Sequence, residues 1–318
     1  MQKVSRVFSR FGFGQLAGMA AIWLSSLAMR PFVTPEKLKE LLGIVGPSAL
    51  LLSIYIPNLF FLLAFWLVVR GIPKAGWQKE RMSPASLLKA FAMMYAVTMV
   101  LSGIGSVVSG GIAPAGTDER TAILDQVVGT GLLTGFLLPA VLAPVVEELI
   151  FRKMMIDRLH NYGETTVIVF TALCFALYHG NLTQAVYTFG VGLFLGYVYC
   201  KTGRMLHTLL MHVALNTLAS SVLLLLPTLT AAGESGTDRL VLAAGGLGLL
   251  IAVLIVAGIV LIIRHLKRRD IVLDNSMAGA VPKGEVLRTV YLNPGVLLFI
   301  LLSVGLIAAD LLEITAPF

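Results

Sequence analysis

Long apolar runs separated by short polar connections constrain this chain more than any other feature. Of its 318 residues, 57% are hydrophobic and only 13% are charged, whereas soluble domains carry about 25% charged residues. An apolar run of about 20 residues is long enough to cross a bilayer as a helix. We therefore expect an all-α, polytopic transmembrane helix bundle of eight or nine spans. The expected spans are at about 11–29, 46–69, 85–109, 127–158, 165–181, 184–200, 205–227, 240–263 and 294–313.

The basic residues predict how the bundle is oriented. If the N-terminus is cytoplasmic, most Lys and Arg residues fall in segments on the cytoplasmic side, among them Arg264 to Arg269, the densest basic cluster. Cytoplasmic loops of membrane proteins carry such an excess of positive charge. We therefore expect a cytoplasmic N-terminus, an uncleaved first helix and a multi-pass protein of a bacterial cytoplasmic membrane, in contact with the lipid bilayer. The net charge of +7 does not indicate a nucleic-acid partner, because the basic residues punctuate the spans.

Small residues in the apolar runs indicate internal packing. Cys174 and Cys200 have no CxxC spacing and are interpreted as small buried hydrophobes, so a disulfide is not expected. Small residues four apart favour close helix contacts in membranes, although glycine is also simply common there. The two such pairs are Gly131 with Gly135, and Gly192 with Gly196.

Three charged residues stand in an apolar stretch of the fourth expected span. Glu147, Glu148 and Arg152 occur within six positions, and charges inside a membrane are expensive and usually functional. Glu148 and Arg152 are four residues apart, so they share a helix face and can form an ion pair. Glu147 points about 100° away from Glu148. It is therefore predicted to remain available for another partner.

Two further polar clusters lie in later spans. His179 ends the fifth span, one turn after Phe175, and His212 and Asn216 share a face of the seventh span. Each cluster alone could be an interhelical hydrogen bond. Together with Glu147 they provide the groups that peptide hydrolysis needs. Glu147 and His179 would activate a water as general bases, and His212 and Asn216 would donate hydrogen bonds to an oxyanion.

Other chemistries fit the sequence less well. It contains no HExxH motif of zinc proteases and no GxSxG motif of serine hydrolases. Intramembrane Glu and His residues also form proton relays in transporters. However, the chain has no paired broken helices in repeated halves. A proton-coupled transporter is therefore kept only as an alternative, and the hydrolase is favoured.

The three motifs, in this order, resemble the CPBP family of type II CAAX prenyl endopeptidases and bacteriocin-processing or bacteriocin-immunity (Abi-like) proteins. The resemblance covers about residues 125–225, and the motifs match without substitution. It implies an endopeptidase with a water-filled cavity in a helical core, in which Glu147 and His179 activate water and His212 and Asn216 bind the oxyanion. Glu148 and Arg152 would organise the site. We expect a catalytic core at 127–227, between N-terminal helices at 1–126 and C-terminal helices with a basic cytoplasmic loop at 228–318.

The resemblance leaves the cofactor and the substrate open. The family has been described both as a metalloprotease and as a glutamate protease. Glu147, His179 and His212 provide the His₂Glu ligand set of a catalytic zinc, although a metal-free mechanism is favoured here. The expected partner is a peptide or protein in or at the membrane. A non-catalytic scaffold or immunity protein is a further alternative.

Overall fold

The computed structural model describes residues 1–31, 47–76, 79–112, 136–232 and 238–312. These residues form helices and no strand, which confirms the all-α class. The first helices are α1 (Gln2–Met29), α3 (Pro47–Val69) and α4 (Pro84–Ile112). The central ones are η1 (Leu138–Leu142), α7 (Ala143–Glu148), η2 (Leu149–Ile156), α8 (Asp157–Leu159), η3 (His160–Tyr162), α9 (Glu164–Tyr178), α10 (Leu182–Thr202) and α11 (Met205–Ala232). The last are α12 (Asp238–Arg268), η5 (Lys283–Glu285), η6 (Leu287–Tyr291) and α13 (Pro294–Leu311).

Each expected apolar span corresponds to a helical segment, although the beginning of the fourth lies outside the described residues. Five helices in the described part of the chain are long and apolar enough to cross a membrane. They are Gln2–Met29, Pro84–Gly111, Met205–Val222, Leu240–Arg268 and Pro294–Leu311. Two shorter helical stretches, Tyr55–Val69 and Glu164–Tyr178, are also apolar. The protein is therefore a multi-pass membrane protein, while the count of nine spans, the cytoplasmic N-terminus and the three-part division stay predictions.

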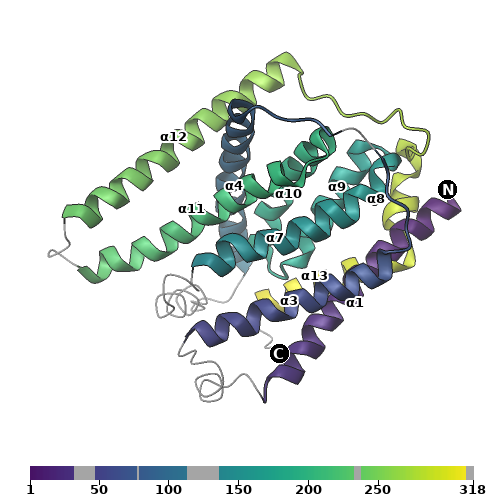
Figure 1. Ribbon diagram of the computed structural model, residues 1–318, viewed down its shortest axis with the longest axis horizontal. Helices are drawn as coiled ribbons and strands as arrows, with labels where there is room; N and C mark the ends of the chain where they lie inside the picture. Colours follow the sequence, from purple (N-terminus) through teal and green to yellow (C-terminus); the bar gives the residue numbers. More distant parts are fainter. Residues whose placement is uncertain (32–46, 77–78, 113–135, 233–237, 313–318) are drawn as a thin grey trace.

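The central helices lie between two groups of outer helices (Figure 1). On one side α4 packs against α10 and α12, and on the other α1 packs against α3 and α13. The helices α7 to α10 occupy the middle, and α11 contacts α7, η1 and α10. The outer face of α12 exposes large aliphatic residues such as Leu242, Leu249 and Val256. This is the surface expected of a helix that faces lipid tails.

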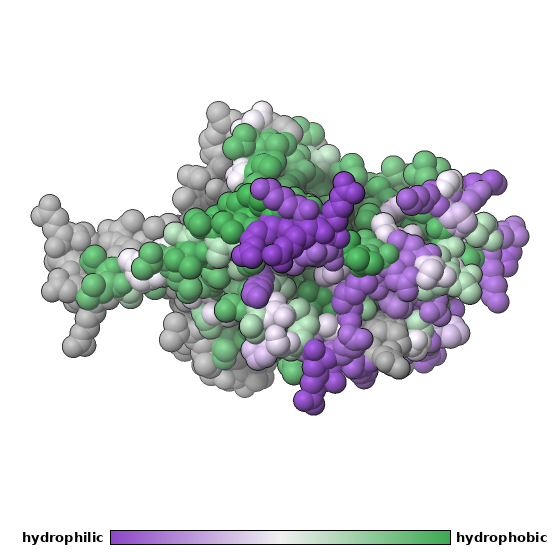
Figure 2. Space-filling model, turned by 90° about the horizontal axis from the view of Figure 1, so that it is seen from above, coloured by the Kyte–Doolittle hydropathy of each residue, from purple (hydrophilic) through white to green (hydrophobic). Residues whose placement is uncertain are grey.

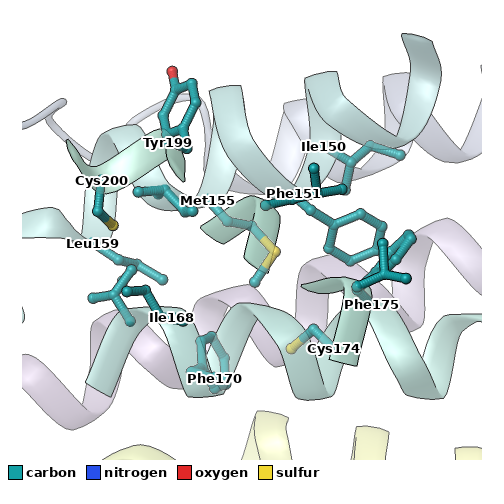
Figure 3. Close-up of a cluster of buried hydrophobic side chains, with 14 of the residues drawn as sticks. Ile150, Phe151, Met155, Leu159, Ile168, Phe170, Cys174, Phe175, Tyr199 and Cys200 are labelled. Carbon is teal, nitrogen blue, oxygen red and sulfur yellow. The ribbon is translucent and has the colours of Figure 1, made fainter. Parts of the chain in front are cut away.

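The centre of the bundle is a dry aromatic and aliphatic cluster. Phe151 and Met155 of η2 are fully buried against α9, where Phe175 points toward Phe151, while Phe170 packs against Phe8 of α1 (Figure 3). The rings of Phe151 and Phe175 meet edge to face with centroids 5.0 Å apart, a favoured geometry for aromatic pairs. Cys174 and Cys200 are free and buried in this core, as the sequence indicated.

Glycines allow α9 and α10 to approach closely. A Cβ at Gly192 would lie 2.8 Å from the Cα of Ala172, and one at Gly196 would lie 3.3 Å from Ile168. The pair therefore acts as a helix contact, which confirms the small-residue interpretation. The other pair, Gly131 and Gly135, lies outside the described residues.

Two expectations about helix boundaries were wrong. The seventh span was expected to stop at Pro227, but α11 continues to Ala232. Proline is tolerated inside membrane helices, because the freed backbone groups find other partners there. The segment after α12 was expected to be a polar loop throughout 270–292, but it includes η5 and the five-residue π-helix η6.

The loop after α12 is tied to the turn before α9. Glu164 accepts a hydrogen bond from the backbone N–H of Asp274 (2.7 Å), and Lys201 of α10 reaches the same carboxylate at 2.5 Å. Asn275 bonds to Thr165 through both its side-chain oxygen and its amide nitrogen. Gly163, with φ of +98°, makes the turn that lets α9 begin here. We refer to Glu164, Lys201 and Asp274 as the junction cluster.

Candidate active site

The helical stretch 138–162 carries the first motif and is irregular. It contains two π-helical segments, η1 and η2, on either side of the six-residue α7. The sequence predicted a regular α-helix here. π-helical turns occur frequently at functional sites because they rotate side chains relative to a regular helix. Glu147 and Glu148 close α7, and Arg152 lies within η2.

Glu148 and Arg152 form the ion pair that their spacing predicted. Arg152 Nε lies 3.3 Å from Glu148 Oε2, and neither side chain is exposed. The guanidinium also lies 5.2 Å from the ring centroid of Phe175, a favourable cation–π distance. The terminal nitrogens of Arg152 have no hydrogen-bond partner among the described residues. Glu148 and the aromatic ring therefore provide the stabilisation of this buried cation.

His212 of α11 lies between the two adjacent glutamates. Its Nδ1 is 3.0 Å from Glu148 Oε1, and its Nε2 is 3.4 Å from Glu147 Oε2. A carboxylate paired with an arginine can only accept a hydrogen bond, so the Nδ1–H of His212 donates to Glu148. This bond fixes the ring and directs Nε2 toward Glu147. The Glu147 side chain keeps 12% of its surface exposed, whereas Glu148 keeps none.

Phe175 connects the histidines to the ion pair. Its ring meets His179 edge to face at 4.9 Å and His212 edge to face at 5.7 Å between centroids. The guanidinium of Arg152 lies over the same ring, in a cation–π contact. Phe175 was part of the sequence motif only as a spacing residue. In the folded protein it is the common wall of the site.

His179 is the last residue before the turn between α9 and α10. Its Nδ1 lies 2.8 Å from the carbonyl oxygen of Phe175. A carbonyl only accepts, so Nδ1 carries the proton, and a neutral ring then has its lone pair on Nε2. Gly180 follows with φ of +71°, and Asn181 caps α10 by accepting from the N–H of Gln184. This turn holds His179 in one tautomer, with a basic nitrogen free to act.

Asn216 does not contact His212 through an observed hydrogen bond but holds the backbone of η1. Its Nδ2 donates to the carbonyl oxygen of Pro139 at 2.9 Å. That carbonyl has no donor within its own helix, because the N–H of Ala143 bonds to Leu138 instead. The next candidate donor, residue 144, is a proline without an N–H. The side chain of Asn216 therefore replaces a missing backbone hydrogen bond, and its second amide hydrogen is left for another acceptor.

Tyrosines near Glu147 were missed by the sequence reasoning. The Glu147 carboxylate is close enough to interact electrostatically with the hydroxyls of Tyr55, Tyr178 and Tyr187, from α3, α9 and α10. Tyr178 donates to Asn58 at 2.5 Å, which ties α9 to α3. The available signal was Tyr178, directly before His179. Tyr55 and Tyr187 lie in apolar runs without a motif, and only the packing of the helices brings them to Glu147.

The structure thus gathers four of the six predicted site residues in direct contact. These are Glu147, Glu148, Arg152 and His212. His179 joins them through the ring of Phe175, and Asn216 lies one turn beyond His212 with its amide on Pro139.

The zinc hypothesis for Glu147, His179 and His212 stays a prediction. Among the residues that the structure describes, no group of three or more His, Cys, Asp or Glu side chains is set to hold a metal ion. Nδ1 of His212 faces Glu148 and Nδ1 of His179 faces a carbonyl oxygen, an arrangement that also orients metal-binding histidines through their other nitrogen.

The fold and the site define a multi-pass helical membrane protein with an ionisable, hydrogen-bonding site between its central helices. Residues 129–218 match the family model described as Rce1-like, type II CAAX prenyl endopeptidase. This match agrees with the resemblance to the CPBP family and includes all six site residues. The central part of the chain is therefore similar to the type II CAAX prenyl endopeptidases. No curated protein and no solved structure matches the chain.

Proposed function

We propose that this protein is an intramembrane endopeptidase that hydrolyses peptide bonds of membrane-associated proteins or peptides. One observation carries the proposal. Glu147 faces Nε2 of His212 across 3.4 Å, while Glu148 and Arg152 neutralise each other behind it. Of the two adjacent glutamates, Glu147 is therefore the one without an ion pair to an arginine. Part of its side-chain surface is also exposed. A water or a peptide carbonyl can approach it there.

In the proposed mechanism Glu147 and His179 are the basic groups. The Glu147 carboxylate takes a proton from a water whose oxygen attacks the carbonyl carbon of the scissile peptide bond. Nε2 of His179 accepts a hydrogen bond from the other hydrogen of that water and so orients the water molecule. The carbonyl π electrons move to the oxygen. When the carbonyl re-forms, the C–N bond breaks and Glu147 returns its proton to the leaving nitrogen.

His212 and Asn216 are proposed to stabilise the oxyanion. In the proposed step His212 is doubly protonated, so that Nδ1–H is held by Glu148 and Nε2–H is directed at the developing charge. Asn216 contributes its second amide hydrogen, because the first is bound to Pro139. Glu148 and Arg152 touch His212 and Phe175 rather than the reacting atoms, so they are positioning residues. Their role is to keep the imidazole ring at one angle.

The test compares the wild type with Glu147→Gln, which keeps the shape of the side chain and removes the base. Membrane proteomes of the two strains are compared for peptides with altered termini. Synthetic peptides that span the altered sites are then offered to purified protein in proteoliposomes without an ion gradient. We expect Glu147→Gln to lower cleavage by about 10²–10⁴-fold while insertion and thermal unfolding stay unchanged.

The matched control is Glu285→Gln, the same chemical change in η5, outside the site. It should cleave at the wild-type rate. Wild-type cleavage rates in Glu147→Gln would place the base elsewhere. Gradient-driven uptake without cleavage would favour a transporter, and neither activity in the wild type would favour a non-catalytic scaffold or immunity protein.

A further inference from the structure

A cavity lies away from the candidate active site, where α12 ends. Its volume is about 860 Å³, and it is enclosed by α4, α9, α10 and α12 with the loop segment before α4. None of the six candidate site residues lines it. The loop is held there by a hydrogen bond from the N–H of Glu80 to the carbonyl oxygen of Thr202, 2.9 Å long. The cavity is therefore formed by several helices and is not a groove along one of them.

The lining of this cavity contains apolar and basic residues, which we call its floor and its rim. The floor includes Met93, Val97, Val169, Phe194 and Leu261. The rim carries Arg81, Lys89, Lys201, Arg264 and Arg268. The view from above shows hydrophilic residues at the centre and toward the right of this face, with hydrophobic residues above and to the left of them (Figure 2). This face includes the end of α12, which is at the top of Figure 1.

The rim has more positive charge than its neighbours neutralise. Lys201 pairs with Glu164, and His265 lies 3.3 Å from Asp270. The rim acids are Glu80 and Asp270. The other four rim cations have no ion pair with a described residue; they are Arg81, Lys89, Arg264 and Arg268. A ligand with a negative charge at one end and an apolar body would satisfy both parts of the cavity.

We propose that this cavity binds an anionic phospholipid. The phosphate would lie between Arg264 and Arg268 of α12 and Lys89 of α4, and an acyl chain would lie on the floor beside Val169 and Phe194. The rim lies at the end of the bundle that the charge distribution predicts to be cytoplasmic. Anionic lipids are concentrated in that leaflet, and basic pockets between transmembrane helices bind their headgroups. The volume is also within the range of small-molecule sites, about 300–1,000 Å³.

The experiment measures lipid retained by the full-length protein. Protein is reconstituted with equal amounts of phosphatidylglycerol and phosphatidylcholine of the same acyl chains, extracted into mild detergent and examined by native mass spectrometry. We expect the wild type to retain one phosphatidylglycerol in preference to phosphatidylcholine. Arg264→Gln with Arg268→Gln should reduce this retention roughly tenfold or more, because each basic group near the surface contributes to anionic lipid binding.

The control variant is Lys267→Gln with Lys283→Gln. It removes the same charge from the same segment of the chain, but neither residue lines the cavity, so it should retain the lipid. If both double variants lost the same amount of phosphatidylglycerol, the retention would be due to general surface charge, and the proposal would be overturned. If the arginine variant does not fold, Arg81→Gln with Lys89→Gln gives the same test from the opposite wall.

A third variant tests the apolar floor. Val169→Trp fills it without changing the rim, and it should lower phosphatidylglycerol retention, whereas Leu302→Trp on the exposed face of α13 should not. Inorganic phosphate at millimolar concentration should fail to displace the lipid. Unchanged retention in Val169→Trp, or displacement by phosphate, would indicate a site for a free anion and contradict a lipid site. These results do not depend on peptide cleavage, so they stand apart from the proposed function.

Discussion

The buried ion pair of the candidate site and the junction cluster each pair a glutamate with a basic residue, in different surroundings. Glu148 and Arg152 are both fully buried, and Glu148 also contacts Nδ1 of His212. In the junction cluster, Lys201 keeps about a third of its side chain exposed, and Glu164 also accepts a backbone N–H.

The difference lies in what remains when one partner is lost. A buried charge without its partner has neither water nor a counter-charge, so breaking a buried pair is strongly destabilising. A partly exposed pair contributes little because water replaces the missing partner. Glu164 would also keep its bond to Asp274. We therefore expect the two regions to respond very differently to the same kind of substitution.

The largest effect on stability is expected at the buried pair. Arg152→Ala and Glu148→Ala should each lower the free energy of unfolding by about 3–5 kcal/mol, since each leaves an unpaired charge. The double variant should lose less than the sum of the two, because it leaves no orphaned charge. Unfolding in detergent measures this cycle. Lys153→Ala, at the adjacent but partly exposed residue, is the control, and strict additivity would refute the coupling.

An intermediate effect is expected at Asn216. Asn216→Ala leaves the partly buried carbonyl of Pro139 without a donor, which should lower the free energy of unfolding by about 1–3 kcal/mol. Pro144→Ala restores an N–H five residues after that carbonyl. In the Pro144→Ala background, Asn216→Ala should therefore be less destabilising by about 1 kcal/mol. Equal losses in both backgrounds would show that the amide does not replace a backbone donor.

The same pair of backgrounds separates the two roles of Asn216. If Asn216 also binds the oxyanion, peptide cleavage by Asn216→Ala should stay impaired in the Pro144→Ala background, although stability improves. Recovery of cleavage together with stability would leave Asn216 a structural role alone.

The smallest effect is expected at the junction cluster. Lys201→Met should change the free energy of unfolding by about 0–1 kcal/mol, because Glu164 keeps its hydrogen bond from Asp274. Salt of about 1 M should reduce the difference from the wild type further, since exposed charges are screened. The deficit of Arg152→Ala should not respond to salt. If Lys201→Met lowered the free energy of unfolding as much as Arg152→Ala does, the two regions would not differ as we expect.

The sequence predicted the contact between Glu148 and Arg152, but it did not predict the contacts between helices. The spacing of Glu148 and Arg152 gave their ion pair, because residues four apart are neighbours on any helix. The spacing did not predict that Glu147 and Glu148 both contact His212, because His212 lies on a helix more than 60 positions later in the sequence. Nor did it give the bond from Asn216 to Pro139, which depends on the π-helical geometry of η1 and on the absence of an N–H at Pro144.

The apolar runs and their basic connections by themselves determined the all-α membrane fold, because a bilayer allows few ways to satisfy the backbone. The spacing of Gly192 and Gly196 likewise indicated a close helix contact. Only the tertiary structure decided which helices lie next to each other. It brought Tyr55, Tyr178 and Tyr187 around Glu147 and made Phe175 the wall between two histidines and an arginine. The reason is physical: local spacing governs contacts within a helix, whereas contacts between helices depend on how whole surfaces pack.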